Sequence, residues 1–129
     1  MYKLLLVDDN TVFRRVLADL LASQFPAVLV EEAGDGAEAL SRVARLRPNF
    51  IIMDIDLPGE NGLELTRKIK GMYDSIEILI LSAHDFPEYR QQAGRYGADF
   101  FQAKGGDNCL SEVLSRIDGA MVSHAMTGE

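Results

Sequence analysis

Five short apolar runs alternate along this chain with segments whose apolar residues recur at helical spacing, and this alternation constrains the fold more than any other feature. The runs are Leu4–Val7, Val28–Val30, Phe50–Met53, Ile76–Leu81 and Phe100–Phe101. Each run ends in polar or turn residues, which is typical of strands buried on both faces. Strands that alternate with helices predict a parallel sheet with helices on both sides.

The segments between the runs have the patterns of amphipathic helices. The two strongest stripes are Phe13, Val16, Leu17, Leu20 and Leu21, and Leu110, Val113, Leu114, Ile117 and Met121. Weaker stripes are Ala37, Leu40 and Ala44; Leu65, Ile69 and Met72; and Tyr89, Ala93 and Tyr96. Asp35 and Asn61, each followed three residues later by a glutamate, suit helix N-termini, and Gly97 suits the end of the fourth helix.

Length and composition are those of one globular domain. At 129 residues, of which 47% are hydrophobic, the chain can form one core and is too short for two ordinary domains. We expect the domain to occupy residues 1–122, and residues 123–129, which are mostly small or polar, to form a frayed tail or the start of a linker. The single cysteine, Cys109, cannot form an intramolecular disulfide, and we expect it half-buried in a helix.

Charge and the N-terminal residues argue against two kinds of partner. The formal net charge of −7 disfavours unspecific contacts with the phosphates of nucleic acids. The chain begins MYKLLLVDDN, in which the apolar run is too short for a signal peptide or a membrane span. The sequence therefore predicts a soluble, cytoplasmic protein that binds neither membranes nor, through this domain, nucleic acid.

Polar side chains stand where four of the predicted strands end. Asp8 and Asp9 follow the first run, Asp54 and Asp56 the third, Ser82 and His84 the fourth, and Lys104 the fifth. Ligands of open parallel sheets bind beyond the carboxyl ends of the strands. We therefore expect these residues to meet at one edge of the sheet, here called the carboxyl edge, where Pro58-Gly59 turns the chain away.

Carboxylates gathered at the carboxyl edge repel one another unless a cation compensates them. Mg²⁺ suits this place, because it prefers oxygen ligands and commonly joins one or two carboxylates to a phosphate. A carboxylate such as Asp54 can also act as a nucleophile and form an aspartyl phosphate. Lys104 and the metal would then stabilise the phosphoryl oxygens, to which Ser82 would donate a hydrogen bond.

Five motifs, in this order, resemble those of response-regulator receiver domains, the CheY-like phospho-acceptor modules of two-component signalling. They are LLVDDN, EAGDGAEAL, IIMDIDLPGENGLE, ILILSAHD and GADFFQAK, and together they span nearly the whole chain. The resemblance implies a three-layer, flavodoxin-like α/β fold, a (βα)5 chain with a five-stranded parallel sheet of order 2-1-3-4-5. It also implies a signalling domain and not an enzyme, since its only chemistry would be its own phosphorylation and dephosphorylation.

The same resemblance implies the catalytic and metal-binding roles. Asp54 would be the phosphorylated residue, with Ser82 and Lys104 completing the catalytic set. Asp9 would bind Mg²⁺ directly and Asp8 mainly through water, and Asp54 would also belong to the metal site. Asp56 would add its backbone carbonyl to the metal site.

Switching and phosphoryl lifetime are implied in the same way. On phosphorylation of Asp54, Ser82 would move toward the phosphoryl group and Phe101 would fill the vacated space. Phe101 stands where many receivers have tyrosine, so it can signal only by moving its ring. Asp56 and His84 would tune the rate of dephosphorylation, because they flank the path of an attacking water.

The phrases EAGDGAEAL and AHDFPEY are most similar to the receivers of NarL/LuxR-type transcription regulators. This implies a sensor histidine kinase as the phosphoryl donor, a possible homodimer on phosphorylation, and control of transcription through a DNA-binding domain absent from this chain. Many receivers have a cis Lys-Pro bond. We expect Lys104–Gly105 to be trans, because a cis bond before a non-proline residue costs about 2.5–4 kcal/mol.

Two other classes of protein could use the same residues. A haloacid-dehalogenase-like phosphatase would use Asp54 as nucleophile and Asp56 as general acid, but that fold has its Asp-x-Asp on the first strand. A pseudo-receiver that only binds proteins would not need Asp9, Asp54, Ser82 and Lys104. Incubation with acetyl phosphate and Mg²⁺ separates the three possibilities.

Overall fold

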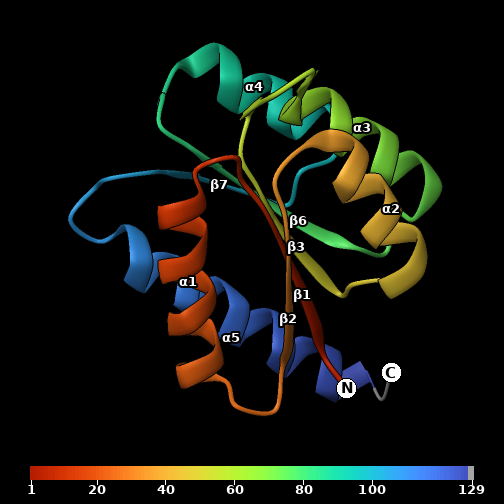
Figure 1. The fold of residues 1–129 in the computed structure, drawn as a ribbon, viewed down its shortest axis with the longest axis vertical. Helices are drawn as coiled ribbons and strands as arrows, with labels where there is room; N and C mark the ends of the chain where they lie inside the picture. The colour runs from red at the N-terminus through yellow and green to blue at the C-terminus, as the bar shows by residue number, and fades with distance from the viewer. Residues whose placement is uncertain (128–129) are drawn as a thin grey trace.

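The computed structural model describes residues 1–127 and has the predicted alternation of strands and helices (Figure 1). In chain order the elements are β1 (Lys3–Val7), α1 (Thr11–Gln24), β2 (Leu29–Ala33), α2 (Gly36–Leu46), β3 (Phe50–Met53), β4 (Asp56–Leu57), β5 (Glu60–Asn61), α3 (Gly62–Met72), β6 (Glu77–Ser82), α4 (Pro87–Arg95), β7 (Phe100–Ala103) and α5 (Cys109–Thr127).

One five-stranded parallel sheet has the order β2-β1-β3-β6-β7. Counting only these five strands, the order is 2-1-3-4-5, so the predicted flavodoxin-like, CheY-like fold is confirmed. The chain places β2 on one side of β1 and then crosses to the other side, so that β3 is the second neighbour of β1. The carboxyl ends of these two strands therefore adjoin at the point where an open sheet of this kind usually binds its ligand.

Helices cover both faces of the sheet, which gives the three predicted layers (Figure 1). One core cluster joins the sheet to α1 and α5, through residues such as Leu17, Leu21, Val113 and Ile117. The other joins it to α2, α3 and α4. Every residue of β3 is buried, as expected for a central strand with apolar side chains on both faces.

Two of the predicted strands are less buried than expected. All residues of β7, and all of β2 except Ala33, are partly exposed. Both strands lie at the edges of the sheet. The prediction of full burial on both faces was therefore wrong for β2 and β7, because an edge strand has a neighbour on one side only.

The predicted apolar stripes are wider than the buried stripes. Val16 is 55% exposed, Met72 56% and Leu110 38%. In α1 the buried residues are Leu17, Ala18 and Leu21. Only the line of residues that touches the sheet is buried, so periodicity alone overestimated the core.

Both predicted N-caps are confirmed. The side chains of Asp35 and Asn61 each accept a hydrogen bond from an amide in the first turn of the helix that follows. Their glutamates do not close a reciprocal capping box, because Glu38 binds the preceding loop and Glu64 pairs with Arg67.

The last helix is longer than predicted. α5 continues to Thr127, so residues 123–127 are helical and not frayed, and the rest of the predicted tail, 128–129, lies outside the described residues. The ring of His124 packs edge-on against Tyr2 with centroids 5.3 Å apart, which holds the end of the helix against β1. Cys109, expected half-buried, is only 4% exposed at the start of α5.

A short hairpin that sequence periodicity did not predict follows β3. β4 and β5 pair antiparallel around Pro58-Gly59, where Gly59 has a φ of 75° that suits glycine. The hairpin returns the chain to the start of α3. Among residues 1–127, no helix is both long enough and apolar enough to cross a membrane.

Gly62, the first residue of α3, touches the backbone of Asp54. A Cβ atom at this position would lie 1.9 Å from the carbonyl oxygen of Asp54, and the Gly62 amide donates to the carbonyl of Ile55 over 2.7 Å. A side chain on Gly62 can be accommodated only if backbone moves. The start of α3 thus fixes the position of the peptide that carries Asp54.

We predict that Gly62→Ala lowers the free energy of unfolding by about 2–3 kcal/mol, because it forces backbone atoms apart in a packed region. The matched control is Gly71→Ala in the same helix, which has open space around it and should gain about 0.5–1 kcal/mol from helix propensity. Urea denaturation measures both values. Equal stabilities for the two variants would contradict the close contact.

Candidate functional site

Backbone hydrogen bonds continue the sheet one residue beyond its strands and so fix the carboxyl edge. These bonds run from Asp8 N–H to Ala33 C=O (3.1 Å), from Asp54 N–H to Val7 C=O (2.9 Å) and from Lys104 N–H to Ser82 C=O (2.6 Å). Asp8, Asp54 and Lys104 are therefore held by the ladder itself and not by free loops.

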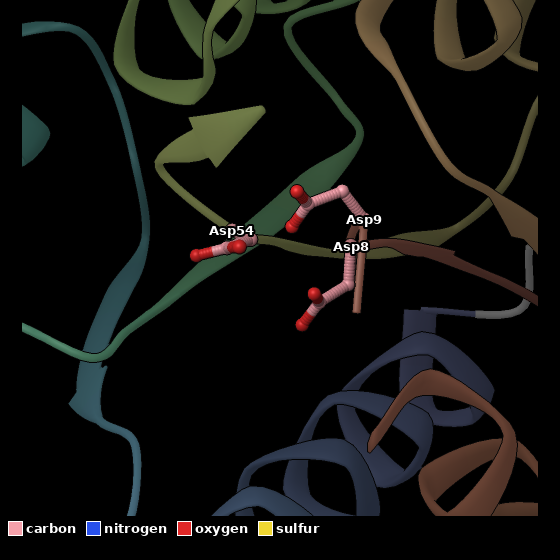
Figure 2. A group of neighbouring side chains, drawn as sticks. All are labelled: Asp8, Asp9 and Asp54. Atoms are coloured by element: carbon pink, nitrogen blue, oxygen red, sulfur yellow. The ribbon is translucent and has the colours of Figure 1, made fainter. Parts of the chain in front are cut away.

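Three carboxylates meet at this edge. Asp8, Asp9 and Asp54 each offer one oxygen, and these oxygens all lie within 4.8 Å of one another. Figure 2 shows the three side chains projecting to the same side of the ends of β1 and β3. Asp8 and Asp54 are each 6% exposed, whereas Asp9 is open to solvent. A group of hard oxygen donors, partly buried and partly open, can hold a metal ion and leave places for water or a further ligand.

Lys104 supplies the cation that the sequence predicted. Its Nζ lies 2.8 Å from Oδ2 of Asp8 and 3.9 Å from Oδ2 of Asp54. The ammonium also stands 4.4 Å from the centre of the Phe13 ring. This ring was predicted only as part of an apolar stripe, and its contact with Lys104 adds a cation–π interaction that helps to place the ammonium.

Asp8 is held on its other side by the start of α1. Its Oδ1 accepts the backbone N–H of Asn10 over 2.9 Å. Asn10 in turn caps α1, because its side chain accepts the N–H of Phe13. The carboxylate of Asp8 therefore has a backbone donor on one oxygen and Lys104 on the other.

The pKa of Asp54 is raised to about 6. Burial of the carboxyl is the main cause, and the charge of Asp8 is the second. Lys104 acts in the opposite direction, and the charge of Asp56 raises the pKa further. The ionised form of Asp54 is therefore unfavourable in this site, and a nearby cation would stabilise it.

The remaining predicted residues of the fourth strand end lie next to this cluster. Ser82 is fully buried at the end of β6, and its Oγ accepts the N–H of His84 over 3.1 Å. His84 Nε2 lies 3.7 Å from Oδ2 of Asp56, and both side chains are at least half exposed. The side chain of Asp56 stands outside the group of three carboxylates.

Phe101 lies further along the sheet, on the face that α4 covers. Its partly buried ring belongs to the margin of that core, and the guanidinium of Arg90 lies 4.7 Å from the ring centre. Residues 1–127 contain no cis peptide bond, so Lys104–Gly105 is trans, as predicted.

The fold and the grouped acidic side chains are those of a signalling receiver domain. The profile of the response regulator receiver domain family matches residues 4–117, and the chain belongs to this family. Receiver domains are a signalling fold and not a family of catalytic enzymes. Asp54 follows β3, the third strand in the chain, whereas the phosphatase alternative would have its nucleophile after the first strand.

Curated relatives include two transcriptional activators. ExaE of Pseudomonas putida is 36% identical over 122 residues, which cover 95% of this chain and 56% of that protein. The DNA-binding activator DevR/DosR of Mycobacterium tuberculosis is 38% identical over 104 residues, covering 81% of this chain and 48% of that protein. The chain thus spans about half the length of these relatives.

Solved structures agree with this assignment. A two-component response regulator of the LuxR family from an Aurantimonas species has a TM-score of 0.84 at 29% identity, covering 94% of this chain and 85% of that chain. The response regulator domain of Thermotoga maritima CheB has a TM-score of 0.82 at 30% identity, covering 94% of this chain and 96% of that chain. The LuxR-family match agrees with the resemblance found in the sequence.

The raised pKa of Asp54 predicts how stability depends on pH. Because the folded pKa of about 6 exceeds the reference value of 3.8, the folded protein binds more protons between these values than the unfolded chain does. The contribution of Asp54 to the free energy of unfolding should therefore fall as the pH rises from about 4 to about 6. Asp54→Asn should abolish this fall.

At pH 7 without divalent ions, we expect Asp54→Asn to raise the free energy of unfolding by about 1–2 kcal/mol, because it removes a buried charge. This is less than the pKa difference alone would give, since solvent near Asp9 screens part of the charge. Urea denaturation at several pH values measures the difference, with the exposed Asp19→Asn as control. A stability difference that stays constant between pH 4 and pH 7 would show that the burial of Asp54 has no electrostatic cost.

Proposed function

We propose that this chain is a phosphorylation-controlled switch that accepts a phosphoryl group on Asp54 from a sensor histidine kinase, with Mg²⁺ bound at Asp8, Asp9 and Asp54. The observation that carries this proposal is the convergence of three carboxylates and Lys104 on one edge of the sheet. Receiver domains of response regulators interact with histidine kinases, which supports this class of partner.

The residues of the site suit an in-line transfer to Asp54. A carboxylate oxygen of Asp54 would attack the phosphorus as the bond to the donor breaks, and the donor would leave with its electron pair. Bound Mg²⁺ would supply neutralisation of the phosphoryl charge. The Lys104 ammonium would donate a hydrogen bond to a phosphoryl oxygen, since it already lies within 4 Å of both Asp8 and Asp54.

Ser82 and Phe101 would transmit the change. Ser82 is buried at the end of β6, next to β3, and its hydroxyl would turn toward the new phosphoryl oxygens. Phe101 is partly buried beside Arg90, and its ring would move inward, into the space that the Ser82 hydroxyl leaves. The surface formed by α4, β7 and α5 would then change its partner or pair two copies of the chain.

The output would be regulation of transcription. ExaE and DevR/DosR are named as transcriptional activators, and this chain covers only about half of each. We propose that DNA is bound by a domain outside these 129 residues, because the net charge of −7 disfavours contact with phosphates by the receiver itself.

Incubation with acetyl phosphate and Mg²⁺ should add one phosphoryl group to the protein, seen as a single mass increase by intact-protein mass spectrometry. Asp54→Asn should remove the addition, because it replaces the proposed nucleophile, whereas both carboxylate oxygens of Asp8 are already engaged by Lys104 and the Asn10 amide. Chelation of Mg²⁺ should also prevent the addition. Repeated turnover of acetyl phosphate would point to a phosphatase. No reaction in the wild type would point to an adaptor that only binds proteins.

Asp56 and His84 would set how long the phosphoryl group persists. Their side chains face one another at the exposed edge of the site, where a water could be held and deprotonated. We expect Asp56→Asn and His84→Ala each to lengthen the lifetime of the phosphoryl group severalfold. This is less than the roughly 10²–10⁴-fold change in rate expected on loss of a positioned general base. Decay of the phosphorylated mass measures it, with exposed Glu88→Gln as control. Unchanged decay in both variants would remove this role.

A further inference from the structure

Arg14, in the first turns of α1, lies beside the acidic cluster without being a member of it. Its Nη1 donates to the backbone carbonyl of Asp8 over 2.6 Å, and its Nε donates to Oε1 of Glu32 over 2.8 Å. Both side chains are mostly buried, with 15% and 24% exposure. The guanidinium thus joins β2 to the loop that carries Asp8 and Asp9.

The carbonyl of Asp8 determines where Asp9 stands. A peptide unit is planar, so the direction of the Asp8 carbonyl fixes the amide and the Cα atom of Asp9. The N–H of Asp8 and both of its carboxylate oxygens are already engaged, by Ala33, Asn10 and Lys104. The bond from Arg14 engages the last polar group of Asp8 and so fixes the peptide that leads to Asp9.

Two further features indicate that the surroundings favour this contact. A Cβ atom on Gly34 would lie 3.1 Å from Nη1 of Arg14, so glycine leaves the space that the guanidinium needs. Glu32 is itself held, because Arg42 donates to its backbone carbonyl over 2.6 Å. Its second carboxylate oxygen, Oε2, lies 3.5 Å from Nε of Arg15, so the carboxylate has an arginine partner on each oxygen.

The helix does not explain the presence of a cation here. A positive charge near a helix N-terminus opposes the helix dipole and is usually unfavourable. Arg14 stands only four residues after the cap Asn10. Its hydrogen bonds to the Glu32 carboxylate and to the Asp8 carbonyl compensate for this unfavourable position.

We propose that Arg14 is a positioning residue that orients the Asp8–Asp9 peptide for metal binding, through a guanidinium held in place by Glu32. The inference rests on the proposed Mg²⁺ site. The planar guanidinium can donate to a carbonyl and a carboxylate at once in fixed directions, which a lysine ammonium cannot reproduce with the same rigidity.

The test is a Mg²⁺ titration of the folded protein by isothermal calorimetry. Groups that orient metal ligands typically change metal affinity by about 10–100-fold when removed, and we expect Arg14→Gln to raise the dissociation constant for Mg²⁺ roughly tenfold. The matched control is Arg45→Gln, which also removes a positive charge and an ion pair with β2, the 2.6 Å pair with Glu31, but has no contact with Asp8. It should leave the dissociation constant unchanged.

A second readout separates positioning from loss of structure. If Arg14 only orients the ligands, the rate of phosphorylation by acetyl phosphate should be slow at low Mg²⁺ in Arg14→Gln and return to the wild-type rate at saturating Mg²⁺. Hydrogen exchange without Mg²⁺ should be faster at the Asn10 amide, which donates to Asp8, and unchanged at amides of β3. Should Arg14→Gln not fold, Arg14→Lys replaces it, with a smaller expected loss of affinity.

Three results would overturn the inference: wild-type affinity in the Arg14 variant, an equal loss in Arg45→Gln, or a phosphorylation rate that stays low at saturating Mg²⁺. Failure of the proposed function gives a different result. In that case the wild type and Asp9→Asn would bind Mg²⁺ equally weakly, and the Asn10 amide would still report whether Arg14 orders the loop.

Discussion

Electrostatic repulsion among Asp8, Asp9 and Asp54 is the constraint around which this domain is organised. Carboxylate oxygens within 4.8 Å of one another, two of them on buried side chains, would separate if their backbones could move. The strand ladder prevents that movement, because Asp8 and Asp54 both hydrogen-bond to neighbouring strands through their amides. Burial, and after it the charge of Asp8, raises the pKa of Asp54, and both effects favour any cation that reaches the site.

The rigidity of the backbone around Asp54 determines where movement can occur. Asp54 is bonded to Val7 on one side, and its carbonyl is in close contact with Gly62 on the other. β3 is buried along its whole length, so the proposed phosphoryl group would displace its less buried neighbours more easily than β3 itself. These neighbours are the loop after β6 and the edge strand β7 with Phe101.

Sequence reasoning identified the strands and the polar residues at their ends, because apolar runs and strand-end carboxylates are local signals. It overestimated the burial of β2 and β7, since position at the edge of a sheet depends on strand order. It did not find Arg14 and Phe13 as neighbours of the site. Their roles depend on which side of α1 faces β2 and Lys104, and a helical stripe does not distinguish a residue that packs from one that also holds a charge.

Asp8 links the metal site to Lys104, because both depend on the same carboxylate. Lys104 is nearer to Asp8, at 2.8 Å, than to Asp54, at 3.9 Å. A divalent ion bound by Asp8 would withdraw negative charge from this pair and weaken its hold on the ammonium. Lys104, whose ammonium lies 4.4 Å from the centre of the Phe13 ring, would then be freer to turn toward Asp54. Metal binding and capture of the phosphoryl group would therefore favour each other through one shared aspartate.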